Sequence, residues 1–322
     1  MEQKNSSEVS EFLLLGLSQV KKVQLILFLI FVLFYSLILP GNILIILTIW
    51  RDRQLCSPMY FFLASLAFLD ICYSSVTPPK MLADFLSQHK TISYGGCMCQ
   101  LFFLHFLGAA EMFLLIAMAY DRYVAICRPL QYMSLVNRGM CCILVGASWA
   151  GGFVHAIILV SLTHQLPFCG PNILDNFFCD VYQVIRLACT DTHRVEVLTF
   201  INNGLIILTG FILLLISYAI LLIRLRLSVT HGKSKASYTC VTHIIVVFVM
   251  FTPAIYLYTR PSEPLPLDKV VAVFHTVVFP LLNPVIYTMR NKEIKSSMKK
   301  VLCKHALCKG ERLTLSPKWQ KS

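Results

Sequence analysis

The sequence predicts an all-α protein, a bundle of seven transmembrane helices followed by a short amphipathic eighth helix. Three observations predict this fold class. Hydrophobic residues make up 57% of the 322 residues and charged residues only 14%, a composition typical of membrane proteins. Apolar stretches of roughly 20 residues, enough for a helix to cross the hydrocarbon core, recur along the chain. Basic residues gather in alternate connections between these stretches, as in polytopic membrane proteins.

Seven apolar segments qualify as spans. They are, approximately, residues 23–49, 58–80, 98–126, 140–161, 197–223, 239–259 and 270–289. They predict one transmembrane bundle over residues 23–289, between an N-terminal segment, 1–22, and a C-terminal segment, 290–322. Because seven is odd, the two termini are expected on opposite sides of the membrane.

Lysine and arginine residues predict the orientation, because they are retained on the cytoplasmic side. The N-terminus and the even-numbered connections hold nine of the 28 Lys and Arg residues and ten acidic residues, a net charge of −1. The odd-numbered connections and the C-terminus hold the other nineteen with four acidic residues, a net charge of +15. We therefore expect an extracellular N-terminus and a cytoplasmic C-terminus. The basic face suits anionic lipid and an acidic cytosolic partner, and needs no nucleic acid.

The N-terminal segment is polar, and the apolar run after it is too long for the core of a cleavable signal peptide. We expect the first span to act as its own insertion signal. Asn5-Ser6-Ser7 is a sequon on the predicted outer face, so Asn5 is a predicted glycosylation site.

Four of the thirteen cysteines lie at the predicted outer edge, where disulfides persist. Four cysteines allow three pairings. The connection from Leu162 to Glu196 is long enough to need fastening or to have a function. The outer cysteines are Cys97, Cys169, Cys179 and Cys189.

Polar residues interrupt the spans at Asn42, Asp70 and Glu111. Such groups should face the bundle interior, where they satisfy one another rather than meet lipid. Two carboxyl groups at similar depth repel each other unless one is protonated or a cation lies between them. The sequence leaves both explanations open, a neutral hydrogen-bonded core or a sodium site.

Asp121 and Arg122 place two charges at the inner end of the third span, where the simplest explanation is an interfacial ion pair. The surrounding motifs favour another explanation. In chain order these motifs are PMYFFL from Pro58, MAYDRYVAIC from Met118 with Pro129-Leu130 and Tyr132 after it, Ser217-Tyr218, KASYTCVTH from Lys235 and PLLNPVIY from Pro280.

Together these motifs, over about Phe12 to Lys300, resemble the olfactory receptors, a family of rhodopsin-like (class A) G-protein-coupled receptors. Cys56 departs from the family, which commonly has a histidine at this position. The resemblance implies the disulfides Cys97–Cys179 and Cys169–Cys189, a pairing that spacing alone does not choose.

The resemblance also implies an activation switch, in which Arg122 pairs with Asp121 at rest and changes partners as the sixth span moves outward. A guanidinium can exchange a carboxylate for hydroxyl and imidazole acceptors. Pro253 and Pro284 permit bends in the moving spans. The predicted switch residues are Asp121, Arg122, Tyr123, Tyr218, His243, Asn283, Pro284 and Tyr287.

The ligand site is expected in the outer half of the bundle, because the switch occupies the inner half. Helical turns counted from Cys97 give the inward face of the third span, and we expect an apolar cavity with few polar groups. Such a cavity suits a small, mostly apolar, uncharged molecule with one oxygen group, bonded to Tyr258, His105 or Asn202. The predicted lining is Leu101, Leu104, His105, Gly108, Ala109, Met112, Gln183, Asn202, Asn203, Ile206, Phe251, Ile255, Tyr258, Val273, Thr276 and Val277.

Two residues narrow the ligand class within rhodopsin-like receptors. The position that holds an aspartate in aminergic receptors is Leu104, and the position of the retinal lysine in opsins is Val277. Neither an amine salt bridge nor a Schiff base is therefore expected. No basic residue lies within the spans near the site, so carboxylic acids are disfavoured.

Other classes of protein fit the sequence less well. A secondary transporter should show internal repeats, and the first and last three spans share no similarity. No catalytic or metal-binding motif such as H-E-x-x-H occurs, so neither an enzyme nor a metal site is expected. His155 and His164 are interpreted as interfacial residues. A ligand-gated channel, or a class A receptor for another small lipophilic ligand, remains the alternative.

The C-terminal segment begins with an amphipathic stretch that is expected to lie along the membrane. Its apolar residues are Ile294, Met298, Val301 and Leu302, among lysines. Cys303 or Cys308 is a candidate for palmitoylation, with a free thiol as the alternative. The chain beyond Lys309 is expected to be disordered.

The function that the resemblance implies is odorant reception at the plasma membrane, in the cilia of olfactory sensory neurons. A small volatile odorant would activate a stimulatory olfactory-type heterotrimeric G protein and raise cyclic AMP. Membrane lipid, arrestin and receptor-trafficking chaperones are further implied partners. No cofactor is expected apart from the sodium ion considered near Asp70 and Glu111.

Overall fold

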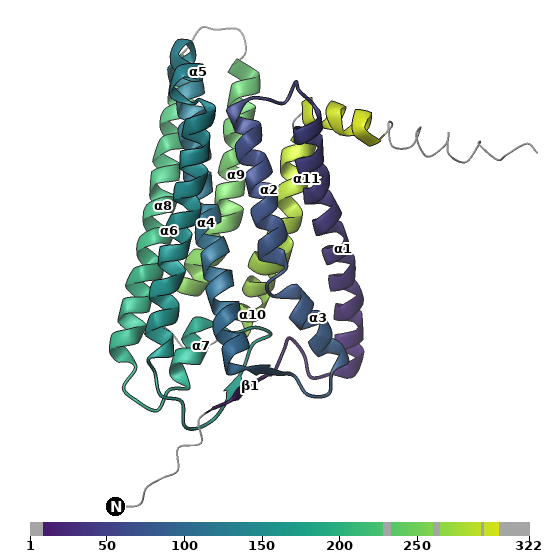
Figure 1. The fold of residues 1–322 in the computed structure, drawn as a ribbon, viewed down its shortest axis with the longest axis vertical. Helices are drawn as coiled ribbons and strands as arrows, with labels where there is room; N and C mark the ends of the chain where they lie inside the picture. The colour runs from purple at the N-terminus through teal and green to yellow at the C-terminus, as the bar shows by residue number, and fades with distance from the viewer. Residues whose placement is uncertain (1–8, 228–232, 260–264, 291–292, 303–322) are drawn as a thin grey trace, which may run out of the picture.

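A computed structural model describes residues 9–227, 233–259, 265–290 and 293–302 of the chain. Long helices run side by side as a bundle, with short connections at its two ends (Figure 1). The described residues form helices, as the predicted all-α class requires, together with one small sheet. The long helices are α1 (Lys21–Arg51), α2 (Pro58–Ser74), α4 (Tyr94–Cys127), α6 (Arg138–His164), α8 (His193–Leu227) and α9 (Lys233–Tyr258).

Two of the seven predicted segments are not single regular helices. The second is α2 followed, after a break, by α3 (Pro78–Leu86). Pro78 and Pro79 have no backbone N–H group to continue α2, but they fit the first turn of a new helix. The last segment consists of α10 (Pro266–Val273), a π-helical turn η2 (Phe274–Val278) and α11 (Phe279–Arg290). The predicted second span over 58–80 thus contains α2 and the start of α3.

Five helical segments within the described residues are long and apolar enough to cross a membrane, and α9 adds a shorter apolar part, His243–Tyr258. Their burial differs widely. Of the most apolar 18-residue stretch of α1, only 17% of the residues are buried. In the corresponding stretch of α4, 72% of the residues are buried. A helix that is apolar all round but mostly exposed is typical of a surface in contact with lipid. The central helix of the bundle is α4.

Helix α6 packs closely against α4 at Gly152. A Cβ atom at this position would lie 2.5 Å from the carbonyl oxygen of Phe106 and 2.8 Å from the amide nitrogen of Ala110. Small residues at such crossings allow two helix backbones to come close, which is a common source of helix association in membranes.

A three-stranded sheet closes one end of the bundle, which we call the sheet end. Its strands are β1 (Glu11–Leu14), β2 (Thr91–Ser93) and β3 (Ile173–Leu174), in the order β2-β1-β3. β1 pairs antiparallel with β2 and parallel with β3. Phe12 of β1 is fully buried and contacts the rings of Phe168 and Tyr94. The sequence did not predict this sheet, because the N-terminal segment was interpreted only as a polar extension.

The eighth helix is present over residues 293–302, and it turns away from the bundle axis beyond α11 (Figure 1). It is held at the end opposite the sheet, which we call the Arg122 end. Ile294 is fully buried, and Ser297 donates a hydrogen bond to Asp52 in the connection after α1. Cys303, Cys308 and the terminal segment predicted to be disordered lie outside the described residues, as does Asn5.

Candidate functional site

A small cavity of about 30 Å³ lies inside the bundle, beside the half of α4 that is nearer to the sheet end. Residues from α2, α4, α6, α8, α9 and η2 surround it, so it lies at the point where most of the bundle meets. The lining residues are Tyr73, Leu104, His105, Gly108, Ala109, Met112, His155, Asn203, Ile206, Ile207, Tyr258 and His275.

The structure brings half of the predicted ligand-binding residues to this cavity. These are Leu104, His105, Gly108, Ala109, Met112, Asn203, Ile206 and Tyr258. The other eight, Leu101, Gln183, Asn202, Phe251, Ile255, Val273, Thr276 and Val277, are not among its lining residues.

Several of these eight side chains are engaged elsewhere. The ring of Phe251 stacks on that of Phe211, with centroids 5.8 Å apart. Thr276 donates a hydrogen bond to the carbonyl oxygen of Ala272 within its own helix, at 2.8 Å. Asn202 donates to the carbonyl oxygen of His155 at 3.4 Å, so its side chain already has a protein partner.

Gln183 lies in α7 (Val181–Arg186), within the long connection between α6 and α8. Its side-chain amide nitrogen donates a hydrogen bond to the carbonyl oxygen of Asp175 in the same connection, at 3.4 Å.

Four lining residues were not in the predicted set, namely Tyr73, His155, Ile207 and His275. The interpretation of His155 as interfacial is wrong, because its side chain is buried and its ring centroid lies 5.8 Å from that of His105. His275 falls within the π turn η2. A π turn is wider than an α turn, so the angular position of its residues differs from a count based on a regular α-helix.

The cavity lining combines apolar side chains with several polar ones. Its lining includes three histidines, two tyrosines and one asparagine, between apolar residues of α4 and α8. The rings of His105 and Tyr258 meet edge to face at 5.2 Å, and those of Tyr73 and His275 at 5.9 Å. The predicted polar groups His105 and Tyr258 are therefore joined in the lining by Tyr73, His155 and His275.

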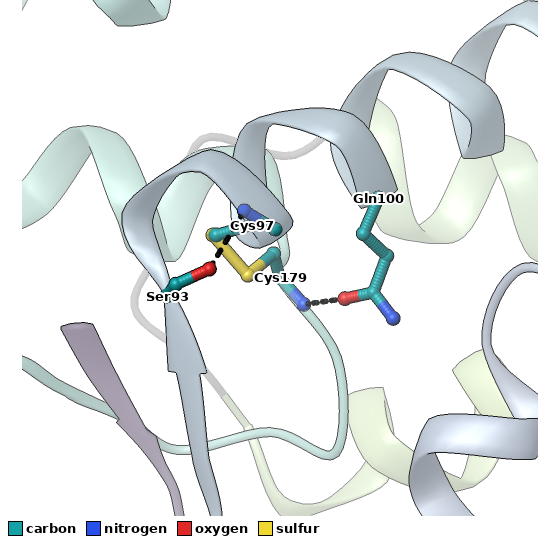
Figure 2. The surroundings of a disulfide bond; sticks show 5 residues. Ser93, Cys97, Gln100 and Cys179 are labelled. Carbon is teal, nitrogen blue, oxygen red and sulfur yellow. Dashed lines mark hydrogen bonds between the residues drawn. A yellow bond between two sulfur atoms is a disulfide. The ribbon is translucent and has the colours of Figure 1, made fainter.

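The long connection after α6 lies over the sheet end of the cavity and is fixed to the helices. Cys179 forms a disulfide with Cys97 of α4, and its amide N–H donates to the side-chain oxygen of Gln100 at 2.9 Å (Figure 2). Tyr182 of α7 donates a hydrogen bond to the carbonyl oxygen of Tyr258, at 3.0 Å. The backbone of a cavity residue is thus bonded directly to this connection.

Figure 2 also shows how the first turn of α4 is fixed beside this disulfide. The hydroxyl oxygen of Ser93 accepts a hydrogen bond from the amide of Gly96 at 3.1 Å and so caps the helix. A second disulfide joins Cys169 to Cys189 within the connection. The structure thus contains both disulfides that the resemblance implies.

Asp180 caps α7 and is a half-buried acidic group of this connection. Its carboxylate accepts hydrogen bonds from the amides of Tyr182 and Gln183, at 3.1 and 3.2 Å. Burial raises the pKa of the Asp180 carboxyl group to about 6, against the lowering effect of these two hydrogen bonds.

Lys269 of α10 joins three separate segments at the sheet end. Its ammonium group forms an ion pair with Asp175 at 2.6 Å and donates to the carbonyl oxygen of Gly16 at 3.2 Å. Gly16 has a φ of +70°, which glycine adopts without steric cost. The N-terminal segment, the long connection and the last span are therefore linked above the cavity.

A second polar cluster lies at the Arg122 end. Asp121 is 1% exposed and forms an ion pair with Arg122, whose Nε lies 2.8 Å from the carboxylate. The hydroxyl group of Tyr132 donates to the other carboxylate oxygen at 2.7 Å. Tyr218 and His243 are hydrogen-bonded to each other at 3.0 Å. The Asp121–Arg122 pair is the one that the resemblance implies for the resting switch, whereas it gives Tyr218 and His243 only as later partners of Arg122.

The remaining predicted switch residues add little to this cluster. Tyr123 is exposed, while the side chains of Asn283, Pro284 and Tyr287 lie outside the described part of the structure. Tyr132 was not in the predicted switch set, although its position after Pro129-Leu130 within the quoted motif was a signal that could have included it.

The predicted polar core residues Asn42, Asp70 and Glu111 are all buried. Asn42 donates to the carbonyl oxygen of Pro280 at 3.4 Å and so links α1 to α11. Within the described ranges, no group of three or more His, Cys, Asp or Glu side chains is placed to hold a metal ion.

Comparison with known proteins agrees with a bundle of membrane-spanning helices. A family model described as olfactory receptor matches residues 31–305. The chain is 58% identical to olfactory receptor 4M1 of Mus musculus over 311 residues, which is 96% of this chain and 99% of the relative. It is 59% identical to olfactory receptor 4M1 of Homo sapiens over 310 residues, with the same coverage. It is 57% identical to human olfactory receptor 4N5 over 308 residues, 96% of this chain and all of that relative.

The bundle and its two clusters define a multi-pass membrane protein of the G-protein-coupled receptor class. The chain belongs to the olfactory receptor family.

Proposed function

We propose that this receptor binds a small volatile odorant in the cavity and responds by activating a stimulatory heterotrimeric G protein, which raises cyclic AMP. The observation that supports this most is that α4 connects the two clusters. It carries His105 at the cavity and Arg122 at the other end, 17 residues apart in one continuous helix, or roughly 25 Å at 1.5 Å per residue.

The size of the cavity suggests how binding is transmitted. A volume of about 30 Å³ has room for about two water molecules, much less than any odorant needs. A ligand therefore binds only to a form in which the surrounding helices are further apart, and it shifts the population toward that form.

Helix α9 is the element most suited to this movement. It carries Tyr258 at the cavity and His243 in the Arg122-end cluster, with Pro253 between them. Proline removes one helical hydrogen bond and permits a bend. We infer that displacement of α9 separates His243 from Tyr218, after which Arg122 leaves Asp121 for the newly available acceptors.

The proposed orientation places the sheet end outside the cell and the Arg122 end in the cytoplasm, with Asn5 glycosylated. We further propose the plasma membrane of olfactory neuron cilia as the location, and anionic lipid, arrestin and trafficking chaperones as partners. The net charge of +15 on the cytoplasmic connections and tail favours this orientation.

For the buried carboxyl groups of Asp70 and Glu111 we propose a compensating positive charge, either a proton or a sodium ion. Replacing sodium by N-methylglucamine in the assay distinguishes the two. A change in agonist potency that Asp70→Asn abolishes indicates sodium, and an unchanged potency indicates the proton.

The test of the main proposal is a panel of volatiles applied to cells that express the full chain, with cyclic AMP as the readout and surface density measured for each variant. Tyr258→Phe and His105→Ala should reduce agonist potency, whereas His193→Ala, at an exposed histidine outside the cavity, should not. If Tyr258→Phe and His105→Ala left potency unchanged for every agonist, the cavity assignment would be wrong.

The alternatives have distinct outcomes in the same cells. Arg122→Ala should keep ligand binding and lose cyclic AMP production. Ligand-gated current in cells without the stimulatory G protein would identify a channel instead. Responses restricted to non-volatile lipophilic compounds would identify a class A receptor for another ligand.

A further inference from the structure

Unpartnered polar atoms are concentrated at the cavity. Eight buried side-chain nitrogen or oxygen atoms lack a hydrogen-bond partner within the described part of the chain. Four of them, the only nitrogens in that set, belong to residues that line the cavity. They are Nε2 of His105, Nδ1 of His155, Nδ2 of Asn203 and Nδ1 of His275. Buried polar groups normally have partners, and each exception calls for an explanation.

The chemistry of these four atoms limits what can satisfy them. A neutral imidazole nitrogen is either a donor or an acceptor, according to the tautomer, while the amide nitrogen of Asn203 only donates. A single carbonyl oxygen has two lone pairs and donates nothing. A ligand with one such oxygen therefore leaves at least two of the four nitrogens unsatisfied.

The arrangement of the four nitrogens indicates two separate polar groups on the ligand. His105 and His155, from α4 and α6, lie together with ring centroids 5.8 Å apart. His275 belongs to η2 and lies against Tyr73 of α2. Apolar side chains, among them Leu104 and Met112, line the rest of the cavity.

From this arrangement, and resting on the proposed function, we infer that the receptor's ligand is a small neutral molecule with two oxygen groups, a hydroxyl and a carbonyl, joined by an apolar skeleton. A hydroxyl group donates once and accepts twice, and a carbonyl accepts twice. The pair therefore provides enough sites for all four nitrogens. This ligand class replaces the single oxygen group that the sequence predicts.

The test uses matched sets of compounds on the full receptor in cells, with cyclic AMP and surface density measured. Each set offers one skeleton as hydrocarbon, alcohol or phenol, ketone and hydroxyketone. One such set is butylbenzene, 4-butylphenol, 4-phenylbutan-2-one and 4-(4-hydroxyphenyl)butan-2-one. In sets that contain agonists, the hydroxyketone should be at least tenfold more potent than either single-oxygen compound.

Variants locate the effect at the histidines. His105→Phe and His275→Phe should each lower hydroxyketone potency about tenfold, toward that of the single-oxygen compounds, while His193→Phe leaves it unchanged. Gly108→Ala distinguishes an effect of cavity shape from an effect of hydrogen bonding to the ligand. Its added methyl group would lie 3.5 Å from the Tyr73 ring, an ordinary contact, so it should lower the potency of all members of a set alike.

Two outcomes overturn the inference in distinguishable ways. If single-oxygen compounds equal the hydroxyketones in potency and the histidine variants do not change the ranking, the ligand class is wrong and odorant reception stands. If no compound raises cyclic AMP while the receptor is at the cell surface, the proposed function falls, and the ligand class with it.

Discussion

The two polar clusters of this receptor differ in how well their groups are satisfied. At the Arg122 end the described groups are paired, Asp121 with Arg122 and Tyr132, and Tyr218 with His243. At the cavity four nitrogens have no partner among the described residues. Both clusters include residues of α4, α8 and α9. The difference indicates that the hydrogen bonds at the Arg122 end are formed at rest and must be broken on activation. At the cavity, a ligand would supply the missing hydrogen-bond partners.

Asp121→Asn should have the largest effect, because it leaves the half-buried Arg122 without its buried counter-charge. Removing one partner of a buried ion pair costs roughly 3–5 kcal/mol. Basal cyclic AMP should rise, since the resting pairing is the state that is destabilised. Tyr132→Phe removes only one hydrogen bond to the same carboxylate, worth about 1–2 kcal/mol, so its basal signal should lie between those of wild type and Asp121→Asn. Equal basal signals for all three at matched surface density would show that this cluster does not hold the resting state.

Gly152→Ala should disrupt the α4–α6 contact beside the cavity. The added methyl group would overlap backbone atoms of Phe106 and Ala110, and backbone moves less readily than a side chain. Overpacking of this kind costs about 1–3 kcal/mol. We expect a lower melting temperature of the purified receptor in detergent and reduced surface expression. Gly146→Ala on the same helix is the matched control, because no atom among the described residues lies within 4 Å of its added Cβ. Similar melting temperatures for the two variants would contradict the close approach.

The connection above the cavity should become less stable as the pH rises through about 6. Burial raises the pKa of Asp180 to about 6, above its value in an unfolded chain, so the folded state favours the protonated form. The stability that this form contributes is complete below pH 4 and is lost as the pH rises through 6. The loss is on the order of 2 kcal/mol.

Asp180→Asn should remove this pH dependence while keeping a side-chain oxygen to cap α7. Melting temperatures of wild type and variant, measured between pH 4.5 and 8, check the sign. A wild-type melting temperature that increased with pH, relative to the variant, would refute it.

Substituting histidine by leucine in the two clusters should change stability in opposite directions. His243→Leu leaves the Tyr218 hydroxyl group without its partner and should destabilise the receptor by about 1–3 kcal/mol. His275→Leu removes a nitrogen that has no partner and should be neutral or stabilise the ligand-free receptor by about 1 kcal/mol. Melting curves of the ligand-free protein compare the two directly. A destabilisation of equal size in both variants would mean that the His275 nitrogen has a hydrogen-bond partner in the receptor. The two clusters would then not differ in how well their polar groups are paired.

The sequence predicts most residues of the Arg122-end cluster, but only part of the cavity lining. Asp121, Arg122, Tyr218 and His243 lie within short contiguous motifs. The structure pairs Asp121 with Arg122 as the resemblance implies, and it adds a hydrogen bond between Tyr218 and His243 that the sequence did not predict. Cavity residues come from six elements, and their selection depended on counting turns of regular helices. That count gave the inward face of α4 from Leu104 to Met112, because α4 is regular and central.

The count was less successful where a helix is irregular or is packed differently from the assumed orientation. The π turn η2 changes which residues of the last span face inward, so His275 was missed while Val273, Thr276 and Val277 were chosen. The sequence places His155 in the outer part of its span, nine residues before His164, but nothing in it shows which side of α6 contacts α4. Gly152, one turn away, marks that side only after its contact with Phe106 is known.

By itself, the sequence determined the class of fold, the approximate positions of the spans, the family, and the cysteines available for the two disulfides. It could do so because a bilayer requires long apolar helices with their backbone hydrogen bonds satisfied internally. Only the tertiary structure decided which side chains share the cavity, how the N-terminal strand joins the sheet, and which buried nitrogens lack a partner. The physical reason is that lipid is as apolar as the bundle interior. Hydrophobicity marks a span but does not tell its inward face from its outward one, and the rotation of each helix is set by close packing against its neighbours.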